Sequence, residues 1–308
     1  MKKLSLLFFL ICNFCFFSFQ SQAIAAEIVI PEKVSQGRGF IIAIKAQAPF
    51  TGYIEWRNKK IKFSSTNLNS QHETQVLLGM PTDEVKTQNI RISITENNQN
   101  NIIKQTIKPL KVNWVTHNLN VAPKYVEPPK EVLNQIAKDQ KTNKATLARM
   151  SDTHTWELPF VRPVNGTISG SFAARRVFNG QPRTPHFGTD MRGAIGTRIL
   201  AMADGVVVCA EPQYFSGNAV WIDHGQGVIS MYGHMSKISV KKGDIIKKGQ
   251  KIGEVGATGR VTGPHLHLSL YIQGVAVDAV PFFSQMPLEI IGGPTKEQPR
   301  PPMPKKQK

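Results

Sequence analysis

Short hydrophobic stretches follow one another closely from residue 27 to residue 115. Residues 90–94 alternate strictly between apolar and polar side chains, as a half-buried strand does. Residues 40–44 and 75–79 are mainly continuous apolar runs, and residues 52–56 form a further strand-like stretch. Turns that contain Asn, Ser and Gly separate these stretches, so the pattern predicts a small β-sandwich.

The pattern changes between residues 116 and 157. Pro123, Pro128 and Pro129 indicate a linker, because proline interrupts both helices and sheets. Residues 131–150 then predict a polar helix with widely spaced apolar positions. We expect this segment to connect two domains without a binding role of its own.

Residues 158–284 are rich in Val, Ile and Gly and show almost no helical period. Strand-like runs occupy residues 198–202, 205–210, 219–223, 227–232 and 265–272. The predicted fold class is therefore mainly β. It consists of an N-terminal β-sandwich-like domain (27–115), a linker with a helix (116–157) and a C-terminal antiparallel β domain (158–284). The proline-rich, basic tail (285–308) is expected to be disordered.

The first 25 residues have the three-part pattern of a secretory signal peptide. Lys2 and Lys3 precede an apolar run over residues 4–19, and a small-x-small sequence follows at residues 23–25. The run is short for a membrane-spanning helix and ends in small polar residues. We expect cleavage after Ala25 or Ala26, export to the periplasm or beyond, and no stable membrane insertion of the mature chain.

The charge balance restricts the class of partner. Lys and Arg outnumber Asp and Glu by 38 to 21, which gives a net charge of +17 and favours an anionic partner. Nucleic acid is not expected, because basic and aromatic residues are not interleaved in any recognisable motif. An anionic cell-wall polymer fits an exported chain better.

Only Cys209 remains after signal cleavage, and its apolar neighbours predict a buried, unreactive thiol. We expect the protein to be a monomer.

Candidate chemistry is concentrated in the C-terminal domain. Five of the eight histidines lie between residues 186 and 267. His186 and Asp190 are four residues apart, and Gly188 between them favours a loop that runs into a strand. In the sequence His265-Leu266-His267, the two histidines share one face of a strand. His234 follows Tyr232-Gly233 at the end of another predicted strand, whereas His224 is expected to be a structural hydrogen-bonding residue.

These residue types suit a catalytic zinc site. Such a site uses three nitrogen or oxygen ligands from the protein and leaves one position for water. Two histidines and one aspartate meet that requirement and keep the bound water acidic. The chain has no His-Glu-x-x-His helix, so another histidine must handle the proton, and His265 and His234 are both candidates.

At these residues the sequence resembles the zinc peptidases of the lysostaphin and LytM type, peptidase family M23. The resemblance covers residues 158–283, with matching motifs at residues 185–190, 203–205, 217–220, 223–227, 231–235 and 256–267. It implies a duplicated hybrid motif fold and one Zn²⁺ per chain, held by His186, Asp190 and His267. It further implies that His265 acts as general base on the zinc-activated water, and that His234 hydrogen-bonds the oxyanion or shares the proton transfer.

The resemblance also implies the substrate, which is the peptide of peptidoglycan. Many Gram-negative members cut D-Ala–diaminopimelate cross-links, and some others cut glycine bridges. The competing hypothesis is a LytM-like protein without catalytic activity that activates other wall hydrolases, but such proteins have lost zinc ligands that this chain retains.

Residues 240–253 also resemble the repeat of biotinyl and lipoyl carrier domains. We attribute this similarity to a shared fold, because no modifiable lysine tip is present.

Overall fold

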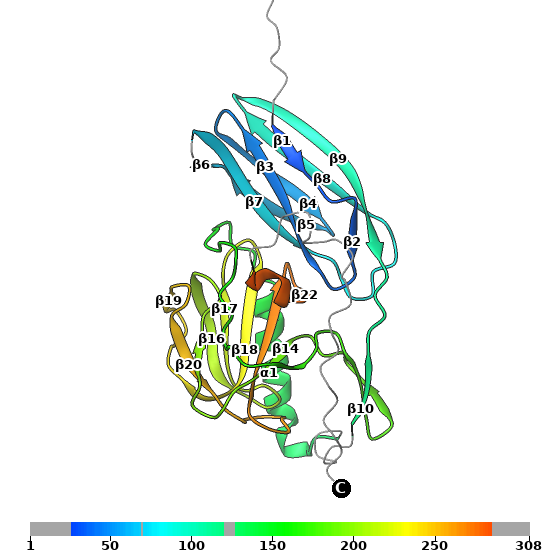
Figure 1. Ribbon diagram of the computed structural model, residues 1–308, viewed down its shortest axis with the longest axis vertical. Helices are drawn as coiled ribbons and strands as arrows, with labels where there is room; N and C mark the ends of the chain where they lie inside the picture. The colour runs from blue at the N-terminus through cyan, green and yellow to red at the C-terminus, as the bar shows by residue number, and fades with distance from the viewer. Residues whose placement is uncertain (1–25, 69, 120–126, 285–308) are drawn as a thin grey trace, which may run out of the picture.

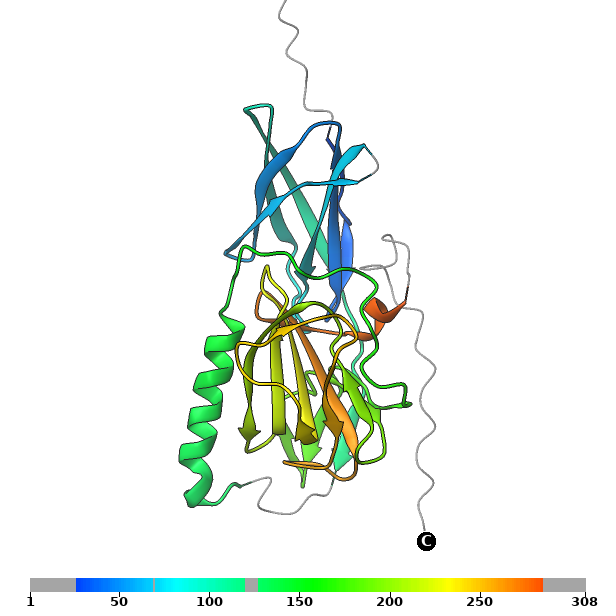
Figure 2. The same cartoon turned by 90° about the vertical axis from the view of Figure 1, so that its left-hand side faces the viewer.

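The computed structural model describes residues 26–68, 70–119 and 127–284. It confirms the mainly β fold class. Two β domains are stacked along the long axis of the molecule, and one helix lies along the side of the second domain (Figure 1, Figure 2). The predicted signal peptide and the C-terminal tail lie outside the described residues.

The N-terminal domain is a sandwich of two sheets. The first sheet has the order β1 (Glu27–Val29), β3 (Gly39–Ala46), β7 (Gln71–Gly79) and β6 (Thr66–Leu68). The second has the order β2 (Lys33–Ser35), β9 (Gln99–Leu110), β8 (Gln88–Glu96), β4 (Phe50–Trp56) and β5 (Lys59–Ser64). All four strands expected from the hydrophobic pattern are present, in β3, β4, β7 and β8. Phe40 and Trp56 meet edge to face in the core between the sheets, with ring centroids 5.3 Å apart.

The first sheet is buried on both faces, which explains the continuous apolar runs in β3 and β7. Ile42 and Ile44 of β3 belong to the core of the sandwich. Ile41 and Ala43 alternate with them and belong instead to the hydrophobic core of the second domain, together with Leu77 of β7. The two domains are therefore packed through a shared apolar core.

The connecting segment is more ordered than a simple linker. Its first residues form β10 (Thr116–Leu119), which pairs in parallel with β12 (Arg175–Phe178) of the second domain. β12 in turn pairs with β13 (Gln181–Arg183). The expected helix is present as a 3₁₀ turn (Lys130–Val132) followed by α1 (Leu133–Leu147). Asp139 of α1 accepts a hydrogen bond of 2.7 Å from the Tyr214 amide, so the helix is attached to the domain it accompanies.

The second domain is built on one large antiparallel sheet. The main strand order is β11 (Ile168–Gly170), β14 (Thr189–Arg192), β21 (His265–Ile272), β18 (Val228–Ile238), β17 (Gly217–Asp223), β16 (Gly205–Gln213) and β19 (Ile245–Ile246). β20 (Lys251–Val255) pairs with β15 (Arg198–Leu200) and β18, β22 (Val275–Val277) pairs with β21, and a 3₁₀ turn (Val280–Phe283) follows. The strands predicted from the sequence all appear here.

Cys209 lies in a small apolar cluster with Val208, Trp221, Ile229 and Met231. Burial, with a contribution from Glu211, raises the pKa of the Cys209 thiol to about 12. The thiol is therefore protonated and unreactive, as the apolar neighbours in sequence predict.

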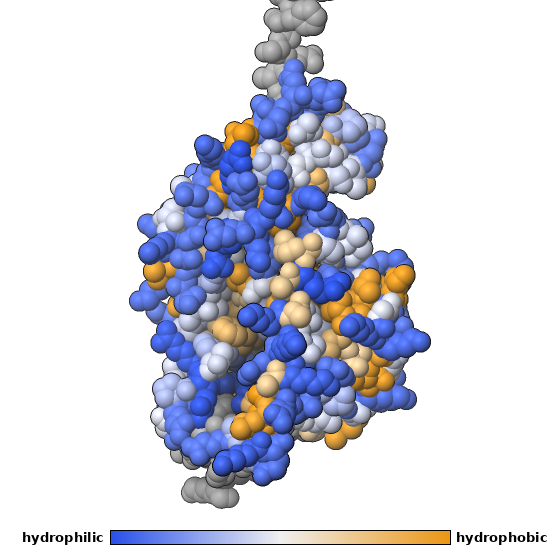
Figure 3. Space-filling model, turned by 180° about the vertical axis from the view of Figure 1, so that it is seen from behind, coloured by the Kyte–Doolittle hydropathy of each residue, from blue (hydrophilic) through white to orange (hydrophobic). Residues whose placement is uncertain are grey.

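The outer surface is largely hydrophilic on the face seen from behind, and hydrophobic residues are gathered there in limited areas (Figure 3). Among the described residues, no helix is both long enough and apolar enough to cross a membrane.

Candidate metal centre

Two neighbouring strands bring the candidate ligands together. β14 pairs with β21 in an antiparallel register that places Asp190 opposite His267. His186 lies in the loop that enters β14, as the presence of Gly188 between His186 and Asp190 predicts. Two backbone hydrogen bonds attach this loop to the segment before β12, from the His186 amide to the Ala174 carbonyl (3.0 Å) and from the Ala173 amide to the His186 carbonyl (2.8 Å).

The alternation of side chains along β21 is the one expected from the sequence. Leu266 and Leu268 are fully buried in the core, with 0% exposure. His265 and His267 point to the opposite face and are partly exposed. The strand thus anchors both histidines through the leucines that alternate with them.

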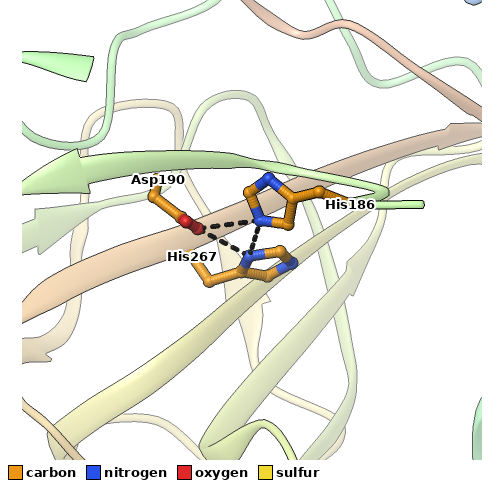
Figure 4. Close-up of side chains that lie close together, drawn as sticks. All are labelled: His186, Asp190 and His267. Atoms are coloured by element: carbon orange, nitrogen blue, oxygen red, sulfur yellow. Dashed lines mark hydrogen bonds and ion pairs between the residues drawn. The ribbon is translucent and has the colours of Figure 1, made fainter. Parts of the chain in front are cut away.

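The side chains of His186, Asp190 and His267 converge on one point (Figure 4). Nε2 of His186 and Nδ1 of His267 lie 3.0 and 2.9 Å from Oδ1 of Asp190. The two ring nitrogens lie 3.0 Å from each other. A tetrahedral zinc site with zinc–ligand distances of about 2.0–2.1 Å has ligand atoms about 3.3 Å apart, close to the edges of this triangle. Among the described residues, these three form a group that could hold a metal ion.

The hydrogen bonds around the triangle favour a cation at its centre. Nδ1 of His186 lies 2.9 Å from the carbonyl oxygen of Ser171, which can only accept, so the Nδ1–H donates and Nε2 carries a lone pair. Nε2 then faces the carboxylate oxygen of Asp190, which also only accepts. Nε2 of His267 has its own partner, the hydroxyl of Ser269, at 2.9 Å. The three inward atoms can therefore all present lone pairs, and the donor set fits Zn²⁺.

Two glycines provide the space for this arrangement. A Cβ atom on Gly170 would overlap with the carboxylate of Asp190. A Cβ atom on Gly188 would collide with the ring of His267. Both positions therefore require the absence of a side chain next to a candidate ligand.

The protonation states within the triangle agree with metal binding. Burial opposes ionisation of Asp190, but electrostatic attraction and hydrogen bonds from the rings of His186 and His267 outweigh it and hold the pKa of the carboxyl well below its usual range. Burial lowers the pKa of His267, against the attraction of Asp190. An ionised carboxylate and a neutral imidazole are the forms in which these side chains bind metals.

His234 and His265 lie beside the triangle. Their ring centroids are 4.9 Å apart, and His234 is 5.8 Å from the ring of His267. Nε2 of His265 lies 3.6 Å from Oδ1 of Asp190. Each ring donates its Nδ1–H to a backbone carbonyl at 2.8 Å, that of Thr258 for His234 and that of Gly263 for His265. All five residues singled out in the sequence therefore meet at one site.

The backbone and environment of His234 are unusual. Its φ of 63° is in the left-handed region, which non-glycine residues adopt at an energetic cost that functional sites often carry. Burial and the nearby rings of His267 and His265 lower the pKa of His234 to about 3. The ring is therefore neutral near pH 7 and holds a lone pair on Nε2.

A cleft of about 650 Å³ opens beside the triangle. Its lining residues are Ser169, Asp190, Arg192, Gly193, Ala194, Thr262, Gly263, Pro264 and His265. A substrate in this cleft can reach the carboxylate ligand and one of the two additional histidines.

Several residues that support the site were not singled out in the sequence. They are Gly170, Ser171, Arg176 and Ser269; Nη2 of Arg176 lies 3.6 Å from Oδ2 of Asp190. Ser269 could have been found by strand alternation, since it follows His267 by two residues. The carbonyl of Ser171 could not, because a backbone contact has no side-chain signature.

His224 is outside the site: it is fully buried, and its ring nitrogens lie 2.6 Å from the Asp204 carbonyl and 2.7 Å from the Ser230 hydroxyl.

The fold and the site together define a β protein in which two histidines and one aspartate could hold a metal ion at the side of an open cleft. Residues 184–279 match the model of peptidase family M23, so this part of the chain is an M23 peptidase domain.

Similar proteins agree with this assignment. Peptidoglycan DD-endopeptidase ShyA of Vibrio cholerae is 45% identical over 125 residues, which are 39% of this chain and 29% of ShyA. DD-carboxypeptidase/endopeptidase Mpg of Neisseria meningitidis is 43% identical over 95 residues, 31% of this chain and 22% of Mpg. The chain thus spans less than a third of the length of either relative. A crystal structure of an M23 peptidase from Pseudomonas aeruginosa has a TM-score of 0.58 and 27% identity, and covers 76% of this chain and 88% of its own.

Proposed function

We propose that the protein is a zinc-dependent endopeptidase that hydrolyses peptide cross-links of peptidoglycan, with the D-Ala–diaminopimelate bond as its target. The observation that carries this proposal is the triangle of His186, Asp190 and His267 beside an open cleft. The match of residues 184–279 to a peptidase family supports hydrolysis of a peptide bond. The name of ShyA, a peptidoglycan DD-endopeptidase, supports the substrate class.

In this proposal, Nε2 of His186, Oδ1 of Asp190 and Nδ1 of His267 hold the zinc ion. When bound, zinc polarises the scissile carbonyl and lowers the pKa of water at the site towards neutrality. The hydrogen bonds from His186 to Ser171 and between His267 and Ser269 keep the two rings oriented towards the ion.

His265 and His234 handle the proton. Because the Nδ1–H of each ring is bound to a carbonyl, each neutral ring presents the lone pair of Nε2 as an acceptor. Of these two histidines we assign the general base to His265, which lines the cleft and lies within 3.6 Å of Oδ1 of Asp190. His265 then passes the proton that it takes from water to the leaving amine. While His234 shares this proton, its buried Nε2–H supports negative charge on the carbonyl oxygen.

The remaining properties of the chain fit a wall enzyme. A signal peptide over residues 1–25 would deliver it to the periplasm or beyond the cell. The surplus of cationic residues would hold a monomeric enzyme near an anionic polymer.

Digestion of purified peptidoglycan by the mature chain, followed by mass measurement of the products, tests the proposal. We expect wild type to convert cross-linked dimers to monomers, His267→Ala to lose this activity, and His72→Ala, altered in the sandwich, to retain it. Release of terminal D-Ala alone would instead indicate a carboxypeptidase. An active His267→Ala variant would refute the proposed metal site.

A further inference from the structure

Arg192 occupies a defined position in the cleft. It follows Asp190 by two residues on β14, so both side chains lie on the same face of the strand. Its partner across the strand pair is His265, and all three residues line the cleft. The Arg192 amide donates a hydrogen bond of 2.9 Å to the Thr167 carbonyl, and Gly166 lies directly against the Arg192 carbonyl. The side chain therefore begins from a rigid backbone.

The charge of Arg192 is not balanced within the cleft. Its side chain is exposed, and no ion pair between Arg192 and an acidic residue occurs in the part of the chain that the structure describes. Asp190 is the sole carboxylate of the cleft lining, and its two oxygens face His186, His267 and Arg176. Apart from Asp190, Arg192 and His265, the lining residues carry no ionisable side chain. An anionic ligand group would supply the missing partner.

We propose that Arg192 binds a free carboxylate of the substrate on the residue that supplies the scissile amide nitrogen. The planar guanidinium is always charged and can donate two parallel hydrogen bonds to a carboxylate. Two residues along a strand span about 6.6 Å. In the proposed substrate the carboxylate carbon lies three bonds from the scissile carbonyl carbon, about one Cα spacing of 3.8 Å away, and the long side chain of Arg192 can span the remaining distance.

This inference rests on the proposed function, to which it adds a basis for specificity. In a D-Ala–diaminopimelate cross-link, the carbon that bears the scissile nitrogen also bears a free carboxylate. A glycine bridge has no charged group at that position. Arg192 would therefore favour the acidic cross-link over neutral ones.

The test uses two synthetic cross-linked peptides, one with the free carboxylate beside the scissile amide and one with a carboxamide there. We expect wild type to cleave the carboxylate peptide with a kcat/KM about 10- to 100-fold higher than the carboxamide peptide. In Arg192→Gln this ratio should fall close to one, because the carboxylate peptide loses more than the carboxamide peptide. Arg192→Lys should restore part of the ratio. Arg198→Gln, which removes an exposed arginine outside the cleft lining, should keep the wild-type ratio.

The outcomes separate the two proposals. A wild-type enzyme that cleaves neither peptide and leaves peptidoglycan cross-links intact would refute the proposed function. A wild-type enzyme that cleaves both peptides equally would refute only the role of Arg192. An Arg192→Gln variant that loses activity equally on both peptides would also refute that role, since it would indicate a structural defect.

Discussion

Nε2 of His267 lies 2.9 Å from the hydroxyl of Ser269, which is two residues further along β21 and only 1% exposed. A metal-binding His267 carries its proton on Nε2, and this N–H then donates to the hydroxyl of Ser269. The hydrogen bond turns Nδ1 towards Asp190 and orients the ring before a metal ion arrives.

Removal of this hydroxyl should weaken metal binding without unfolding the protein. We expect Ser269→Ala to lower zinc affinity about 10- to 100-fold, as is typical when a hydrogen-bonding partner of a ligand is lost. Competition with a chromophoric chelator measures the affinity. Ser236→Ala serves as the control, because it removes a hydroxyl of the same domain that donates to the Val255 carbonyl and not to a histidine ring. Equal zinc affinities in the two variants would contradict the positioning role.

The absence of a side chain at Gly170 is a second requirement of the site. Gly170 is paired with Asp190 across β11 and β14, and an added methyl group would overlap with the carboxylate. We expect Gly170→Ala to displace Asp190 and reduce zinc affinity at least 10-fold, the size of effect expected when a ligand is misoriented. Gly263→Ala is the matched control, because a methyl group there meets no atom within 4 Å. Unchanged affinity in Gly170→Ala would show that the carboxylate can move aside freely.

Buried His224 should make the protein sensitive to acid. Burial lowers the pKa of its ring to about 4, below the value of about 6.5 in an unfolded chain. The unfolded state therefore binds a proton more readily, and stability that is present above pH 6.5 is lost as the pH falls towards 4. Between pH 7 and pH 5, the free energy of unfolding should fall by about 2 kcal/mol more in wild type than in His224→Gln.

Urea unfolding at both pH values measures this difference. His72→Gln, altered in the sandwich, should follow wild type. Parallel pH dependence in wild type and His224→Gln would mean that His224 does not contribute to acid sensitivity.

Leu77 and Leu78 are adjacent on β7 but are buried in different cores. Leu77 packs with the second domain, whereas Leu78 packs inside the sandwich. Truncation of either to alanine should cost about 2–5 kcal/mol. We expect Leu77→Ala to accelerate amide hydrogen exchange in β22 more than Leu78→Ala does, because Leu77 supports the contact between the domains. Equal exchange in β22 of the two variants would argue against a shared core.

The fold was predictable where a local pattern determines the element. The strict alternation at residues 90–94 predicts β8, and the two leucines that alternate with His265 and His267 predict the orientation of β21. The apolar runs of β3 and β7 also predict strands. They do not show what covers the second face of the sheet, because burial against another domain depends on tertiary packing.

The site was predictable in its residue types but not in its support. His186, Asp190, His234, His265 and His267 stand out because few residue types bind metals or transfer protons near pH 7. Arg176 does not stand out, since its contact with Asp190 depends on the tertiary placement of β12, which pairs with the connecting strand β10. The segment of β10 resembles a linker in sequence, because a short parallel strand at a sheet edge has no strong hydrophobic pattern.

The zinc content of the mature chain tests the central claim most directly. After dialysis in buffered zinc, we expect about one zinc ion per chain in wild type and in His234→Gln, and less than about a tenth of that in the folded double variant Asp190→Asn/His267→Ala, which retains one of three ligands. Elemental analysis gives the stoichiometry, and circular dichroism verifies folding. A wild type that binds no zinc, or a double variant that binds as much as wild type, would contradict the assignment of His186, Asp190 and His267 as the metal centre.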